Sequence, residues 1–112
     1  MTRHVGFLHV VYFWPPEGAT PEAAAEAATR LAEGCRKHLP NIPGVLRLEV
    51  GFPAGTAREV VDNSYAVVLL VEFADAAAHD VYQDHPDHHR FIEECRTYWS
   101  RVQVYDSVVA PA

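Results

Sequence analysis

Two segments that are apolar at almost every position place the strongest limit on how this chain folds. Residues 5–14 are rich in β-branched and aromatic side chains, and Pro15-Pro16 ends the run. Residues 65–73 are almost continuously apolar. Side chains alternate between the two faces of a strand, so an apolar residue at every position predicts burial on both faces. Both segments are therefore expected to be strands that are covered on both sides.

A long helix is predicted between these strands. Thr20 is a favourable N-cap, Pro21 suits the first helical turn, and Glu22 places a negative charge near the positive end of the helix dipole. An alanine-rich run then continues to about His38. The helix is expected to bury one stripe, formed by Ala24, Ala28, Leu31, Cys35 and Leu39.

The remaining elements follow from alternation and from turn residues. Residues 45–52 alternate well enough for a second strand, and residues 53–63 form a loop long enough to border a pocket. Asp75 caps a second helix, and residues 101–109 form the last strand. The order is strand, helix, strand, strand, helix, strand.

The second helix is expected to break at His85-Pro86. Pro86 disfavours helical backbone at His85 and suits the first position of a new helix, so His85 is the cap of the break. The second piece is predicted to run to about Trp99. Phe91 and Cys95 turn inward there, together with Trp99 or Tyr98.

This order predicts an α+β fold in which residues 1–112 form one domain. The subunit is a ferredoxin-like βαββαβ unit with a four-stranded antiparallel sheet and helices on one face. Two helical elements cover only one face, and the other would expose more apolar surface than monomers usually tolerate. We therefore expect a two-fold homodimer that packs sheet against sheet into an α/β barrel.

The composition argues against nucleic acid and membranes as partners. The formal charge is −6 and Lys37 is the single lysine, so a basic face for nucleic acid is absent from the sequence. The apolar run at residues 5–14 is too short to cross a bilayer, which favours a cytoplasmic protein without a membrane partner. Cys35 and Cys95 have no CxxC partners and are expected to be buried thiols.

Histidines concentrate at the helix break. His88 lies in the first turn of the new helix, where the dipole disfavours a protonated imidazole. A neutral His88 is suited to act as a general base, and Tyr82 one helical turn before the break could donate a proton. The alternative is structural: His85 caps the helix and His88 satisfies a buried carbonyl.

The chain resembles the stress-responsive A/B barrel family, also called the dimeric α/β barrel domain. The resemblance spans nearly the whole sequence and is strongest in the Tyr-x-x-His-Pro-x-His motif. The residues that carry it are His9–Trp14, Ile42–Val45, Val50-Gly51, Val61–Tyr65, Tyr82–His88, Phe91-Ile92 and Val104–Asp106.

The resemblance implies site residues as well as a fold. One plant member of the family is a polyketide cyclase that performs an aldol condensation, and its catalytic tyrosine and histidine correspond to Tyr82 and His88. Its first-strand histidine corresponds to His9 and the aspartate near its last strand to Asp106. The present chain differs from that enzyme in length, in the loops after Trp14 and Gly51, and in the additional His89.

Two classes of function are consistent with these residues. One is a cofactor-independent cyclase or lyase acting on a polyketide-like or aromatic carbonyl compound, with His88 as base, Tyr82 as acid or oxyanion donor, and His9, His85 and Asp106 in support. The other is a non-catalytic homodimer, associated with stress or binding a small hydrophobic ligand.

A metal site at the helix break is the weaker interpretation of the same histidines. His85 and His89 have the i, i+4 spacing of helical zinc sites, but His85 is a cap, so no metal is expected. His79 is expected to be solvated or to have a local role.

Overall fold

The elements follow one another in the predicted order. The computed structural model describes residues 4–111. Within that range the elements are β1 (Phe7–Trp14), α1 (Pro21–His38), β2 (Arg47–Gly51), β3 (Val67–Phe73), α2 (Ala76–Asp84), α3 (Pro86–Cys95), the 3₁₀ turn η1 (Arg96–Tyr98) and β4 (Arg101–Val108).

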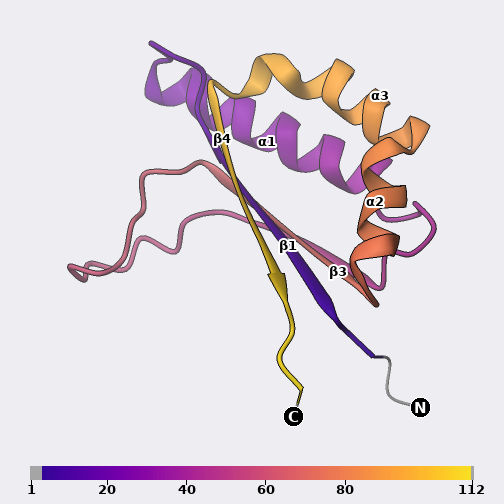
Figure 1. Ribbon diagram of the computed structural model, residues 1–112. Helices are drawn as coiled ribbons and strands as arrows, with labels where there is room; N and C mark the ends of the chain where they lie inside the picture. Colours follow the sequence, from indigo (N-terminus) through magenta and orange to yellow (C-terminus); the bar gives the residue numbers. More distant parts are fainter. Residues whose placement is uncertain (1–3, 112) are drawn as a thin grey trace.

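The strands form one antiparallel sheet in the order β2-β3-β1-β4. The two apolar strands β1 and β3 are the inner pair, with Phe7 opposite Phe73. All three helices lie on one side of the sheet, and the loop between β2 and β3 extends away from it (Figure 1). This is the predicted ferredoxin-like arrangement.

The predicted helix starts are confirmed by their caps. The Ala23 backbone N–H donates to the Thr20 hydroxyl at 3.1 Å, and the Ala78 N–H donates to the Asp75 carboxylate at 2.9 Å. Each bond satisfies one of the backbone donors that a helix leaves unpaired at its start.

Several boundaries differ from the predicted ones. The paired segments of the second and third strands are shorter than the predicted ranges 45–52 and 65–73, because ladder pairing ends before the apolar pattern does. The helix predicted to reach Trp99 ends at Cys95. The chain then tightens into η1, and Trp99 already has extended backbone leading into β4. Both Tyr98 and Trp99 pack against the core.

Alternate residues of the inner strands meet different surroundings. On the covered face, under the helices, β1 and β3 are buried at every position, whereas on the open face they are only half-buried in the single chain. The expected burial on both faces is thus met on one face by this chain alone. The covered face presents Phe7, His9, Val11, Phe13, Val67, Leu69, Val71 and Phe73; the open face presents Leu8, Val10, Tyr12, Trp14, Val68, Leu70 and Glu72.

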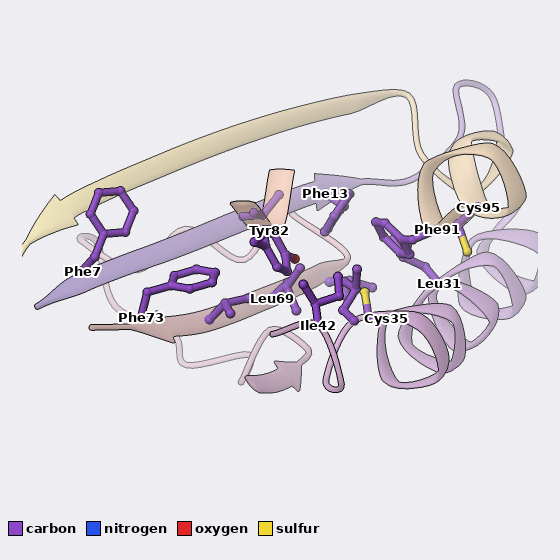
Figure 2. Close-up of a cluster of buried hydrophobic side chains, with 14 residues drawn as sticks. Phe7, Phe13, Leu31, Cys35, Ile42, Leu69, Phe73, Tyr82, Phe91 and Cys95 are labelled. Carbon is purple, nitrogen blue, oxygen red and sulfur yellow. The ribbon is translucent and has the colours of Figure 1, made fainter. Parts of the chain in front are cut away.

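The core fills the space between the covered face and the helices. Figure 2 shows Tyr82 lying among the buried side chains of the sheet and of α1 and α3. Cys35 and Cys95 are both free and buried, as predicted. Burial raises the pKa of each thiol, so both are neutral packing groups.

Candidate active site

The predicted helix break is present at His85. Its backbone is extended (φ −68°, ψ 141°), so it ends α2 and begins α3. The Asp87 N–H donates to Nδ1 of His85 at 3.0 Å, which makes the imidazole the N-cap of α3. His85 therefore positions the helix that carries His88.

A cavity of about 290 Å³ lies between the covered face of the sheet and the helices α2 and α3. It includes three of the histidine and tyrosine positions that the sequence singled out, namely Tyr82, His88 and His9. His85 and Asp106 are not in its lining. The other lining residues are Val11, Phe13, Leu69, Gln83, Phe91, Ile92, Trp99, Val102 and Val104.

Tyr82 carries the most unusual polar atom of the cavity. Its side chain is fully buried, and among the described residues its hydroxyl has no hydrogen-bond partner. A buried hydroxyl without a partner costs about 1–3 kcal/mol, so such atoms are uncommon in folded proteins. Burial also raises the pKa of Tyr82, which keeps the phenol protonated and able to donate.

His88 lies next to this phenol. The two ring centroids are 4.9 Å apart, in an edge-to-face arrangement. Burial is the main cause that lowers the pKa of His88 to about 4, with smaller contributions from the positive forms of His9, His89 and His79. His88 is therefore neutral at pH 7, as expected, but burial rather than the helix dipole is the main cause.

His9 and Asp106 form a second pair on the sheet. They are directly opposite each other across β1 and β4, and Nδ1 of His9 is 2.6 Å from Oδ1 of Asp106. Only 3% of His9 is exposed. Burial lowers the pKa of His9, and the Asp106 carboxylate opposes that change. A neutral His9 donates its Nδ1–H to Asp106, which leaves Nε2 unprotonated.

Two residues of α2 join this pair, and neither was predicted from the sequence to belong to the site. The side-chain nitrogen of Gln83 is 3.1 Å from Nε2 of His79 and 3.5 Å from Nε2 of His9. The expectation that His79 is solvated or local is wrong: its side chain is only 12% exposed and its ring stacks on Phe7. The spacing of positions 79, 82 and 83 on one helical face was the available signal.

A metal site at His85 and His89 has no support in the structure. Nδ1 of His85 already accepts the capping hydrogen bond, and His89 is exposed on α3.

One known protein family matches most of the chain. The model of the stress responsive A/B barrel domain matches residues 7–109. No match was found among curated protein sequences.

Solved structures agree with this match. A family member with a ferredoxin-like fold from Mesorhizobium loti is 26% identical, with a TM-score of 0.72, over 96% of this chain and 100% of that one. A dimeric ferredoxin-like protein of unknown function from Thermobifida fusca is 16% identical, with a TM-score of 0.74, over 97% and 95% of the two chains. The hydroxynitrile lyase of Passiflora edulis is 12% identical, with a TM-score of 0.75, over 98% of each chain. With the family model matched from β1 to beyond β4, the chain belongs to the stress responsive A/B barrel domain family.

Proposed function

We propose that the protein is a cofactor-independent enzyme of the cyclase or lyase type. It would remove a proton beside a carbonyl group of a polyketide-like or aromatic compound. His88 would act as the general base, and Tyr82 as the acid or oxyanion donor.

The unpaired hydroxyl of Tyr82 carries this proposal. The Tyr82 side chain lines a largely apolar cavity, and its protonated hydroxyl, which is itself buried, has no partner among residues 4–111, so a small shift of the ring would present this donor to a ligand. A carbonyl oxygen of a ligand would supply that partner. The bond would strengthen as negative charge develops on the oxygen during enolate formation, which is the condition for stabilising a transition state.

The remaining polar residues have supporting roles in the proposal. His85 fixes the start of α3 and so the position of His88. Asp106 holds His9 in one tautomer at the cavity wall. Both are positioning residues here, since neither lines the cavity itself.

The cavity lining favours a neutral substrate. None of its residues is a lysine, arginine, aspartate or glutamate, and most are aliphatic or aromatic. A carboxylate bound there would lose its hydration without gaining a cation. An aromatic or alkyl ketone would gain apolar contacts at no such cost.

A homodimer is part of the proposal. The open face carries large apolar side chains that this chain leaves half-buried. A hollow of about 500 Å³ lies there, lined by Val10, Tyr12, Trp14, Asp62, Tyr65 and Tyr105. A second copy packed sheet against sheet would cover this surface. The Thermobifida fusca protein of the same fold is described as dimeric, which supports this arrangement.

No helix within residues 4–111 is both long and apolar enough to span a membrane. The cytoplasmic location expected from the sequence stays a prediction.

One observation favours the alternative of a ligand-binding protein without turnover. A pKa of about 4 makes His88 a weak base, because proton transfer is most efficient when the pKa lies near the working pH. In that function, Tyr82 would still donate to a bound carbonyl, and no bond would be made or broken.

Proton exchange distinguishes the two functions. 2-Tetralone, a neutral aromatic ketone, would be incubated with the protein in deuterated buffer, and loss of its α-protons followed by NMR. The wild type should accelerate exchange over buffer, and His88→Ala should lower the accelerated rate by about 100-fold or more. His89→Ala, which removes an exposed histidine of the same helix, should leave the rate unchanged.

An exchange rate equal to that of buffer would remove the enzymatic proposal for this substrate class. If 2-tetralone still quenched the fluorescence of a Trp14→Phe variant, whose single tryptophan is Trp99 in the cavity wall, the binding function would stand. An unchanged rate in His88→Ala would exclude His88 as the base.

A further inference from the structure

Two imidazoles and one carboxylate gather beside the proposed catalytic pair. His9, His79 and Asp106 each offer one ligand atom, and these atoms all lie within 4.8 Å of one another. They come from three elements, β1, α2 and β4, so the fold brings them together. The family motif at the helix break contributes none of the three.

Their geometry is close to that of a metal-binding set. Oδ1 of Asp106 is 2.6 Å from Nδ1 of His9, and Oδ2 of Asp106 is 3.9 Å from Nε2 of His79. Ligand atoms around a tetrahedral zinc ion are roughly 3.3 Å apart, as follows from bond lengths of about 2.0–2.1 Å. To hold an ion, the His9–Asp106 pair has to open by about 0.7 Å and His79 has to move closer by on the order of 1 Å. Asp106 on the edge strand β4 is exposed enough to move.

The surroundings would hold these ligands in orientation. The His79 ring stacks on Phe7 at 4.7 Å and meets Phe73 edge to face at 5.6 Å. The Gln83 amide nitrogen lies 3.1 Å from Nε2 of His79 and 3.5 Å from Nε2 of His9, so an ion would replace it as the partner of His79. Metal-binding histidines usually donate their other ring N–H to an oxygen, and the Gln83 side-chain oxygen would provide it after the amide rotates by half a turn.

From this arrangement we infer that His9, His79 and Asp106 form a binding site for a divalent transition-metal ion such as Zn²⁺. Two imidazoles and a carboxylate are borderline ligands that suit zinc, cobalt and iron(II), and they are a poor match for the oxygen-only sites of Mg²⁺ and Ca²⁺. The ion occupies the position of the proton that His9 and Asp106 share. This inference differs from the absence of a metal expected from the sequence.

Binding releases a proton. The His9 ring is neutral with its proton on Nδ1, so an ion at Nδ1 moves that proton to Nε2, where Gln83 accepts the hydrogen bond, while the ion's fourth position is left to water. That water ionises more readily on the ion than in bulk, and it supplies the proton that is released. The chemistry proposed at Tyr82 and His88 needs no metal, although the ion would share its supporting residues His9 and Asp106.

Isothermal titration tests the site directly. Untagged protein, freed of metal with a chelator, would be titrated with Zn²⁺ and separately with Co²⁺. One ion should bind per chain, and bound Co²⁺ should show the visible absorption of a low-coordinate nitrogen and oxygen site. His79→Ala and Asp106→Asn should each weaken binding by at least about 10-fold, the smallest loss that removing even an outer-shell partner typically causes.

His89→Ala is the matched control, since it removes an exposed histidine and leaves the three ligands in place. It should bind as the wild type does. Far-ultraviolet circular dichroism would show that each variant is folded. Binding that is absent in the wild type, equal in His79→Ala, or lost in His89→Ala would overturn the site. Because the readouts are stoichiometry and a cobalt spectrum, a negative result in proton exchange leaves this test unaffected.

Discussion

Neighbouring residues of β1 point to opposite faces of the sheet and meet different surroundings. His9 faces the helices, is buried, and lies in the wall of a cavity, whereas Val10 faces the other side and stays half-buried in the single chain. The same contrast continues along β3, from Leu69 to Leu70. In β1, the covered face thus carries the histidine of the candidate site, and the open face carries apolar side chains suited to association; charged residues on the open face gather toward the β2 edge, at Arg47, Glu49 and Glu72.

The difference explains why the chain needs apolar residues on both faces. The helices α1, α2 and α3 close the covered face. Tyr82 and His88, on the sides of α2 and α3 that face the sheet, are therefore shielded from water, and burial shifts their pKa values. Within residues 4–111 no helix covers the open face (Figure 1). In the proposed homodimer a second molecule covers this face, whereas the cavity is already formed within one chain.

The largest effect is expected on the open face. Val10 lies opposite Tyr105 in the middle of that face. Val10→Glu would place a charge in the interface of each copy, and burying two unpaired like charges costs several kcal/mol, so the dimer dissociation constant should rise by about 100-fold or more. Sedimentation equilibrium measures the change.

Ala25→Glu is the control, because it adds the same charge on the exposed side of α1. It should not alter the dimer. A Val10→Glu variant that dimerises as well as the wild type would mean that the open face is not the interface.

On the covered face, the pH dependence of stability should report His88. The unfolded chain binds a proton near pH 6.5, whereas the folded chain keeps His88 neutral down to about pH 4. The contribution of His88 to the free energy of unfolding is constant above pH 6.5. It decreases by about 2 kcal/mol, after allowance for partial exposure, as the pH falls from 6.5 to about 4. Urea unfolding at pH 7.5 and pH 4.5 measures the loss.

His88→Phe keeps a ring beside Tyr82 and removes the titration, so it should lose less stability between the two pH values than the wild type does. His89→Phe changes an exposed histidine and should keep the wild-type difference. Equal losses in the wild type and in His88→Phe would show that His88 is accessible to protons in the folded state.

Sequence predicts the covered and open faces better than it predicts the site. The nearly continuous apolar runs at residues 5–14 and 65–73 specify two central strands, and Thr20, Asp75 and Pro86 specify helix starts, because these signals are local. Strand ends are predicted less accurately, since the ladder partner decides where pairing stops.

The site needs information that is not local. The pairing of His9 with Asp106 depends on the register of β1 against β4, which the sequence alone does not define, and only the family resemblance suggests it. His79 has the sequence context of a solvated residue in a short helix, and its burial against Phe7 depends on how α2 packs over the start of β1. Gln83 has no chemical signature of its own until both imidazoles are in place.

The smallest expected change in stability concerns a single atom of the layer between the covered face and the helices, the hydroxyl oxygen of Tyr82. Tyr82→Phe removes the hydroxyl that has no partner among residues 4–111 and keeps the ring that packs against Phe73. Relief of an unpaired buried donor should raise the free energy of unfolding by about 1 kcal/mol, while exchange of the 2-tetralone protons should fall.

Tyr65→Phe is the control, because Tyr65 is a half-buried tyrosine outside the core, and it should change neither quantity. If Tyr82→Phe instead lost stability, the hydroxyl would have a bonding partner in solution, and the reason to assign it to a ligand's oxygen would be gone. A gain in stability together with a loss of exchange would mean that the Tyr82 hydroxyl destabilises the fold and serves the reaction. A polar atom on the helix-covered side of the sheet would then be explained by function and not by packing.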